Sequence, residues 1–571
     1  MMSRVTGPAE PFGLSSRAVG ALPIVSGFFA RAGIEGLLER YLPCSERGHG
    51  PSPARVIGVL VRNLCVAHDP LYSLGEWAQA HEGAVLGLGF GEAEQLNDDR
   101  VGRALELLFC CDRASLLSEL MLGVISEFQI DVSQLHNDST SISVYGAYSD
   151  ADGREHEGKA TPRITFGHSK ARRPDLKQLV FILTVAADGA VPIAHRLVGG
   201  NTEDGSTHIE SWQGLRVLAG RDDFLYVADC KLASSHVMAH IDEHGGRFLT
   251  PLPAGRNESK RLREWMITAA PDWTLAASAP SRYPGQGQDV WKVTGSPIRS
   301  VEGYRIIWVH STAKERGDRQ TRTDRIARAL AALDTLKARL ASPRCRFHDR
   351  QAVEHATNAT LTRTKATELV NVQITEHTEE WTREESRGPR RKPALRRFAR
   401  ARFLITPEIN APAVTALAAA DGCYPLITND TQLSNTELLG AYRYQPNLEK
   451  RHHQLKTAQH AAPIYLKNPA RIEALFTCHF LALLISCLIE RQARQTMTND
   501  HITTLQLYPE HRPCAAPTAE LIYDAFAPLT RHHLHHQTQH IQTFHPALTP
   551  LHHQLLALLN INPHAYTTTP P

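Results

Sequence analysis

A series of short apolar runs, each closed by a turn signal or an acidic residue, constrains the fold of this chain most strongly. A tight turn at Asp188 and Gly189 separates two of these runs, which predicts consecutive antiparallel strands. A helix is expected over residues 207–219, before the last run. The runs that read as strands are residues 135–141, 179–185, 190–198 and 224–229. Strands followed by a helix and a further strand predict a mixed α/β core.

The sequence on either side of these runs predicts further domains. With 571 residues the chain is too long for one core, and its length suggests roughly two to four domains. Helical spacing of apolar residues dominates before residue 130, while the region after residue 252 is polar and basic and reads as an insertion. The expected division is a helical N-terminal domain (1–129), a first core part (130–252), an inserted basic subdomain (253–402), a second core part (403–500) and a His/Pro-rich tail (501–571).

Net charge, cysteine content and apolar runs bear on whether the protein binds nucleic acid, is secreted or spans a membrane. The formal net charge of +3 neither demands nor excludes a nucleic-acid partner, so the distribution of charge must decide. The 10 cysteines contain no C-x-x-C pair, which indicates reduced thiols in a cytoplasmic protein. The first residues lack the apolar stretch of a secretory signal. The apolar run 474–489 contains His479 and is too short to span a membrane, so a buried core helix is expected.

Three acidic residues stand where metal-dependent chemistry would need them. Asp138 closes the first strand of the expected core, Asp229 closes the fourth, and Glu449 lies at the start of an expected helix. Hard divalent cations prefer carboxylate oxygens, and cleavage and joining of phosphodiesters use two such ions. A lone aspartate at a strand end is more often a turn or capping residue. Rival acids that we interpret as turn, surface or supporting residues are Asp188, Asp204, Asp222 and Asp223.

The motifs around the three acids resemble those of DDE transposases of bacterial insertion sequences. Residues 135–148 (LHNDSTSISVYGAY) resemble the first-aspartate motif and residues 226–234 (YVADCKLAS) the second. Tyr442, Glu449 and Lys456 match the Tyr, Glu and Lys of a Tyr-x2-Arg-x3-Glu-x6-Lys pattern. Further similar stretches are residues 168–204, residues 421–430 (DGCYPLITND), residues 463–491 and the N-terminal stretch NDDRVGRALE. The resemblance extends over roughly residues 12–500.

This resemblance implies an RNase H-like core with an inserted subdomain and two Mg²⁺ or Mn²⁺ ions bound by Asp138, Asp229 and Glu449. It implies cleavage at the terminal inverted repeats of an insertion sequence and joining of the 3′-OH ends to target DNA. The implied partners are double-stranded DNA and a second copy of the chain in a paired-end complex, with no membrane. We expect a cytoplasmic protein that is nucleoid-associated when bound to DNA. A DNA-binding repressor derived from a transposase and an RNase H-like nuclease without strand transfer remain alternatives.

Several basic and aromatic residues are candidates for DNA contacts. The pattern's arginine falls at Gln445, so Arg443 or Arg451 must take its place if that contact exists. Lys456 lies about two helical turns after Glu449 and shares its face. Tyr442 reads equally well as a stacking residue or as a packed aromatic. The dense basic run 387–402, with Arg390, Arg391 and Lys392, reads equally as a phosphate-binding element or a solubilising loop.

The C-terminal tail is rich in histidine and proline. Eight histidines lie between residues 532 and 553, but no cysteine partners them and their spacing matches no fixed ligand pattern. A helical or loosely ordered tail that packs on the core is therefore the preferred interpretation over a metal-binding tract.

Overall fold

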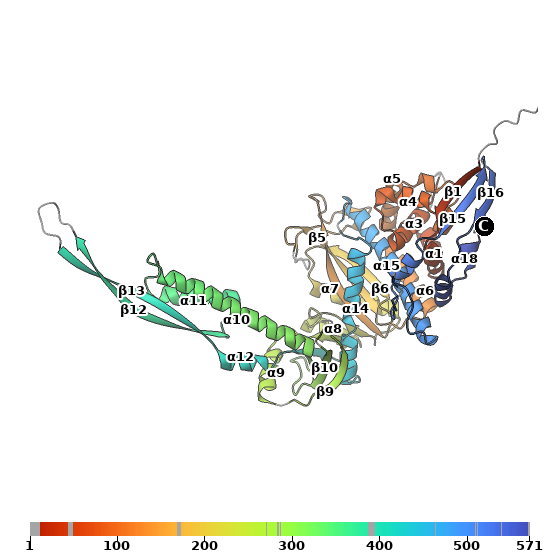
Figure 1. The fold of residues 1–571 in the computed structure, drawn as a ribbon. Coiled ribbons are helices and arrows are strands. Elements are labelled where there is room, and N and C mark those ends of the chain that lie inside the picture. Colours follow the sequence, from red (N-terminus) through yellow and green to blue (C-terminus); the bar gives the residue numbers. More distant parts are fainter. Residues whose placement is uncertain are drawn as a thin grey trace, which may run out of the picture. The chain divides into compact units, whose positions relative to one another are not determined.

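The computed structural model shows a mixed α/β protein of two compact units (Figure 1). It describes residues 12–43, 50–167, 173–269, 271–281, 285, 287–385, 394–462, 464–508, 510, 512–537 and 539–568. Unit 1 comprises Met1–Thr250 and Gly440–Pro571, and unit 2 comprises Pro251–Leu439. The predicted limits of the insertion, 253 and 402, differ from these, and residue 402 lies within a strand of unit 2.

Helices dominate the first part of unit 1. Ser52 caps one of them by accepting a hydrogen bond from the Arg55 amide, with proline at the next position, and Asn97 caps another through the Arg100 amide. The elements are β1 (Phe12–Ala18), α1 (Leu22–Arg31), α2 (Ile34–Tyr41), α3 (Pro53–Val66), α4 (Leu74–Ala80), α5 (Asp98–Cys110) and α6 (Arg113–Phe128). The helical prediction for this part is confirmed except at its start, where β1 is a strand.

The sheet of unit 1 places the first two candidate acids. Its strand order is β6-β5-β2-β7-β8, with β2 antiparallel to β5 and parallel to β7. The elements are β2 (Gln134–Val144), β5 (Lys177–Ala186), β6 (Pro192–Gly199), α7 (Asp204–Ala219), β7 (Leu225–Val227), α8 (Ser235–Glu243) and β8 (Arg247–Pro251), with a short hairpin of β3 (Glu155–His156) and β4 (Lys159–Ala160). All four predicted strands and the predicted helix are present.

The core of unit 1 is organised around α15 (Pro469–Asn499). Asn468 caps this helix by accepting a hydrogen bond from the Ala470 amide, and residues such as Phe476 and Leu484 are fully buried. Among the described residues α15 has the length and composition to cross a membrane, but 89% of its most apolar window is buried inside the protein. The predicted buried core helix is thus confirmed, and it packs against α3 and α5.

The C-terminal tail is more regular than its composition suggests. Its elements are α16 (Ala519–Phe526), β15 (Thr530–His536), β16 (Gln539–Phe544), α17 (Pro550–Leu558) and α18 (His564–Thr567). Strand β15 pairs with the N-terminal strand β1, so that Phe12 lies opposite His536 and Ala18 opposite Thr530. The expectation of a helical tail that packs on the core holds for α16 and α17, which pack against α15. It was wrong for β15 and β16, because pairing with a strand from the other end of the chain cannot be read from local sequence.

Unit 2 contains an antiparallel sheet and a long two-stranded ribbon. The sheet has the order β14-β11-β10-β9, and the ribbon is formed by β12 and β13 alone. The elements are α9 (Asn257–Thr268), β9 (Thr274–Pro280), β10 (Gln288–Gly295), β11 (Arg305–Ser311), α10 (Thr312–Ala341), α11 (Arg350–Thr364), β12 (Val370–Glu385), β13 (Ala394–Ile409), α12 (Ala411–Ala418) and β14 (Cys423–Thr428). Helix α13 (Asn435–Tyr442) leads into α14 (Gln445–Thr457) of unit 1.

Candidate active site

Neighbouring parallel strands bring Asp138 and Asp229 to equivalent positions. In the β2–β7 pair His136 lies opposite Val227, and each aspartate follows two residues further along its strand direction. Each carboxylate also accepts a hydrogen bond from nearby backbone, from the Ser139 amide at 2.8 Å for Asp138 and from the Lys231 amide at 3.0 Å for Asp229. Asp229 follows the last residue of β7, but Asp138 lies inside β2, which continues to Val144, so the prediction that Asp138 closes its strand was wrong. Because β2 and β7 are neighbours, the two acids lie at the same level of adjacent strands.

Helix α14 lies along strand β2 and carries the third acid. Near its start the Gln445 side chain bonds the His136 ring at 2.7 Å and donates to the Asn137 carbonyl at 3.3 Å. Near its end the Lys456 amine donates to Thr140 Oγ1 at 2.6 Å. Glu449 lies four residues after Gln445 and seven before Lys456, which places it on the face of α14 that follows β2.

The phenol of Tyr442 links Glu449 to the sheet edge electrostatically. Burial, followed by electrostatic interactions with Cys230, Glu449 and Asp229, raises the pKa of Tyr442 to about 12. A phenol responds to both carboxylates only if both lie in its neighbourhood. Tyr442 therefore stays protonated and remains a hydrogen-bond donor at neutral pH, between the second and third candidate acids.

Two buried histidines that the sequence did not single out face the aspartates. His452 Nε2 lies 3.9 Å from Asp138 Oδ2, and His208 Nε2 lies 4.0 Å from Asp229 Oδ1. The ring nitrogen Nδ1 of His208 is within 3.1 Å of the Tyr226 hydroxyl. The sequence could have indicated His452 as a site residue, because it follows Glu449 by three residues and therefore shares its face of α14. It could have indicated His208 as well, because this residue closes the stretch GGNTEDGSTH (199–208) at the end of the similar segment, but no role was predicted for it.

Asp138 and Asp229 offer the carboxylate oxygens that hard divalent cations prefer. The side chains of Asp138 and Asp229 are 21% and 38% exposed, so an ion can reach their oxygens. Within the part of the chain that the structure describes, no group of three or more His, Cys, Asp or Glu side chains is close enough to hold a metal ion. The described structure therefore does not gather Asp138, Asp229 and Glu449 into one metal-sized group: the two aspartates lie on neighbouring strands, and Glu449 is exposed on α14.

The residues predicted to contact DNA differ in their burial. Arg451 is buried: its guanidinium pairs with Glu490 at 2.8 Å and donates to the carbonyls of Gly189 and Ala190. The prediction that Arg451 contacts DNA is therefore wrong, because its donors already bind the core. Arg443 is half-buried in the turn before α14, and Lys456 is half-buried beside Thr140. Arg390, Arg391 and Lys392 lie outside the described residues.

The rival aspartates are held by arginines. Asp188 binds Arg491 through both carboxylate oxygens, at 2.9 and 2.5 Å. Burial raises the pKa of the Asp188 carboxyl, but the hydrogen bonds from Arg491 and from the Asp131 amide outweigh it, so the pKa lies below its ordinary value. Asp222 pairs with Arg216 and Asp223 with Arg221, each at 2.6 Å. These contacts fit the turn and surface roles predicted for them, and the side chain of Asp204 lies outside the description.

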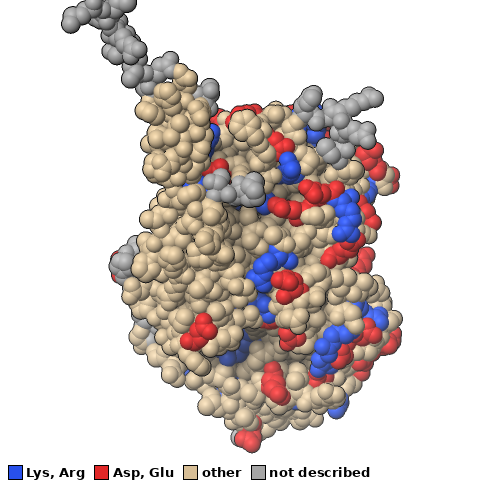
Figure 2. Space-filling model, turned by 90° about the vertical axis from the view of Figure 1, so that its right-hand side faces the viewer, with Lys and Arg blue, Asp and Glu red and all other residues tan. Residues whose placement is uncertain are grey.

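The charged side chains on the face shown in Figure 2 are mixed in sign. Lys and Arg side chains alternate there with Asp and Glu side chains instead of gathering into a patch of one sign.

Comparison with known proteins assigns only part of the chain. Residues 14–122 match a domain of unknown function (DUF4277), which covers the N-terminal strand and helices. No curated protein matches the chain. Among solved structures, a piggyBac transposase synaptic complex with hairpin DNA, determined by cryo-EM, is similar with 10% identity and a TM-score of 0.26. That match covers 51% of this chain and 61% of the transposase chain, which is less than two thirds of its length.

Proposed function

We propose that this protein is a DNA transposase with an RNase H-like core. It cleaves DNA at the terminal inverted repeats of an insertion sequence and joins the freed 3′-OH ends to target DNA. The observation that carries the proposal is the pairing of β2 with β7, which sets Asp138 and Asp229 side by side, with the Glu449 helix lying along β2. The motif order Asp, Asp, Glu along the chain supports the same conclusion.

Asp138, Asp229 and Glu449 are the proposed ligands of two Mg²⁺ or Mn²⁺ ions. Ions bound there would activate the attacking oxygen and stabilise the leaving oxygen of an in-line displacement. The protein's own contribution is positional: Gln445 and Lys456 hold α14 against β2, and Tyr442 offers a neutral phenol beside the second and third acids. Arg443 and Lys456 border this edge and are proposed to meet DNA phosphates.

The proposed partners follow from this chemistry. Double-stranded DNA supplies both the cleaved ends and the target, and two copies of the chain hold the paired ends. The helical N-terminal part and the basic elements of unit 2 are proposed to recognise the ends. The reaction is proposed to take place in the cytoplasm, on nucleoid DNA.

The test is cleavage of DNA that carries the sequences flanking the coding region, in the presence of Mg²⁺. Asp138→Asn should abolish cleavage and leave end binding unchanged, because an amide removes a metal ligand without changing shape. Asp222→Asn is the matched control, since Asp222 pairs with Arg216 at the surface and should be dispensable. Metal-dependent cleavage that persists in Asp138→Asn would refute the assignment. Cleavage without joining of pre-cut ends would identify a nuclease, and binding without cleavage a repressor.

A further inference from the structure

The ribbon of unit 2 is long and regular. Strands β12 and β13 pair antiparallel over their full length, from Val370 opposite Ile409 to Glu385 opposite Ala394. Figure 1 shows the two strands running together along α10 and α11 and then continuing past these helices. The half of the ribbon beside α10 and α11 is therefore packed against helices, whereas the described part of the half beyond them is not.

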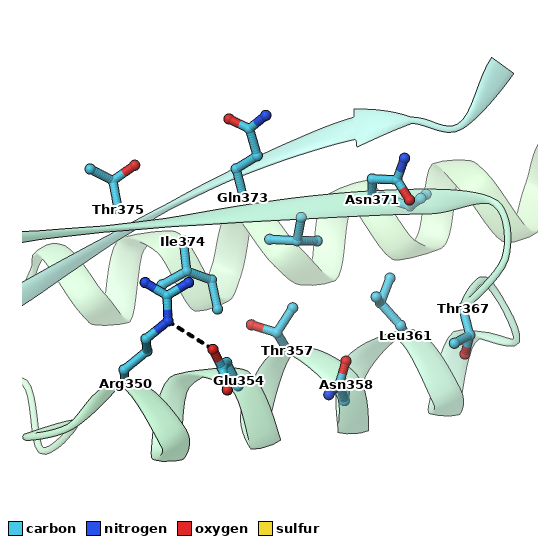
Figure 3. A pocket seen from close by; sticks show the side chains of 12 residues that line it. Arg350, Glu354, Thr357, Asn358, Leu361, Thr367, Asn371, Gln373, Ile374 and Thr375 are labelled. Carbon is cyan, nitrogen blue, oxygen red and sulfur yellow. Dashed lines mark hydrogen bonds and ion pairs between the residues drawn. The ribbon is translucent and has the colours of Figure 1, made fainter.

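The half nearest the helices is anchored. Phe403 and Ile405 of β13 are buried with Leu336, Leu340 and Val353 of α10 and α11. Figure 3 shows how β12 contributes: Ile374 points toward α11, while Gln373 and Thr375 point to the opposite side. The groove between α11 and β12 has a volume of about 590 Å³, and the Arg350–Glu354 ion pair, at 2.8 Å, lines it on the α11 side (Figure 3). Alternation along the strands thus fixes which side chains share a face.

The distal half is exposed. Every described β12 side chain from Glu376 to Glu384 is exposed, including Trp381 at 41%, and Leu395 on β13 is 72% exposed. A two-stranded ribbon is at best marginally stable alone in water. A ribbon that extends with its aromatic residues in solvent therefore suits a surface that meets a partner.

The same alternation separates charge between the two faces of this half. Residues directly opposite each other in an antiparallel pair share a face. One face, the basic face, carries the positions of four arginines and two glutamates: Arg383, Arg396, Arg400, Arg402, Glu379 and, at the end of β12, Glu385, with His377, Trp381 and Phe398 between them. The other face, the acidic face, carries Glu376, Glu380 and Glu384 against the single Arg397.

The basic face is preorganised by contacts among its own residues. Trp381 and Phe398 stack with ring centroids 5.7 Å apart and an interplanar angle of 16°. Arg400 lies 5.2 Å from the Trp381 ring and Arg396 lies 5.7 Å from the Phe398 ring. Glu379 accepts hydrogen bonds from Arg400 and Arg402, each at 2.7 Å. Arg383 and Arg396 are exposed and lie opposite each other further along the ribbon.

We propose that the basic face of the ribbon binds duplex DNA. A two-stranded antiparallel ribbon fits the major groove, and arginines on one face can reach phosphates and guanine edges together. The acidic face repels phosphate, so only one side of the ribbon is used and the orientation of the DNA is defined. This inference rests on the proposed function for the class of partner, and it adds the surface that holds that partner.

The test compares two neighbouring arginines on opposite faces of the same strand. Full-length protein is titrated against a labelled 30-base-pair duplex, and binding is followed by fluorescence anisotropy at several salt concentrations. Arg396→Glu should weaken binding at least tenfold, whereas Arg397→Glu, with the same change of charge, should alter it less than threefold. Arg396→Ala should lower the slope of log K against log salt by about 1, as for one lost phosphate contact.

Equal losses in Arg396→Glu and Arg397→Glu would overturn the inference, because net charge and not the face would then control binding. No loss in either variant, or stronger binding to a single strand of the same sequence, would overturn it as well. Circular dichroism and thermal unfolding verify that both variants are folded. Asp138→Asn should bind the duplex like the wild type, so a failure of the ribbon and a failure of the proposed catalysis are separately visible.

Discussion

At the scale of single residues, the role of Gln445 could not be predicted from the sequence. In the transposase pattern an arginine stands at this position, and its replacement raised the question of a lost DNA contact. The structure places the Gln445 amide in the interior, 8% exposed, between the His136 ring and the Asn137 carbonyl. Burial makes the pKa of His136 fall to about 4, so the ring is neutral and Gln445 satisfies it as a hydrogen-bond partner.

Replacing Gln445 should therefore affect stability. Gln445→Ala leaves a buried ring nitrogen and a backbone carbonyl without this partner, which should cost about 1–3 kcal/mol in the free energy of unfolding. This loss in the free energy of unfolding is measured by urea titration, with circular dichroism as the signal. Asn447→Ala on the same helix is the control. An unchanged midpoint for Gln445→Ala would show that the amide does not hold α14 against β2.

His452 and His453 provide a matched pair for the site itself. His452 is 6% exposed and faces Asp138, whereas the adjacent His453 is exposed. If His452 positions the Asp138 carboxylate, His452→Gln should lower the cleavage rate by about 10–100-fold, as for other groups that orient metal ligands, and should shift its pH profile. His453→Gln should do neither. Equal rates for the two variants would exclude a positioning role.

At the scale of elements, α14 and α15 are joined by a buried ion pair. Arg451 and Glu490 have side chains only 7% and 3% exposed and lie 2.8 Å apart. Removing one partner leaves a buried charge uncompensated, so Arg451→Ala should cost about 3–5 kcal/mol. The exposed neighbour Lys450 is the control, and Lys450→Ala should be nearly neutral. Comparable losses from the two variants in urea unfolding would contradict the structural role assigned to Arg451.

The elements also show which parts of the fold were accessible from sequence. Apolar runs with clear period and turn signals, such as β2, β7 and the helix α15, were predicted because burial on a sheet or in a core leaves a local pattern. The end of β2 was misjudged, since the strand continues past Asp138 to Val144. Strand β15 was missed, since its histidines do not alternate with apolar residues and its partner β1 lies at the other end of the chain. Residue 402 was misread as a boundary because the arginine-rich strand β13 resembles a linker in composition.

At the scale of the whole molecule, several buried histidines predict sensitivity to mild acid. Burial is the main cause that lowers the pKa of His136 to about 4 and that of His195 and His479 to about 3, from an ordinary value of 6.5. Below pH 6.5 the unfolded chain takes up protons that the folded chain excludes, so this stability is present above pH 6.5 and is lost as the pH falls toward 4 and 3.

We expect the free energy of unfolding to decrease steadily between pH 6.5 and 4. Urea titrations at pH 7.5, 6.0 and 5.0 measure it, and His195→Gln should reduce the slope because a glutamine takes up no proton. A constant free energy over this range would mean that these rings are accessible to protons in the folded state.

The central claim concerns the whole chain, because Asp138, Asp229 and Glu449 are distant in sequence and must converge on bound metal. Iron-mediated cleavage of the polypeptide tests it directly: Fe²⁺ replaces Mg²⁺ or Mn²⁺, ascorbate and peroxide generate radicals at the ion, and mass spectrometry locates the cuts. The account predicts cuts near residues 138, 229 and 449 that Mn²⁺ suppresses and that Asp138→Asn removes. Cuts confined to other regions, such as the histidines of β15 and β16, would contradict it.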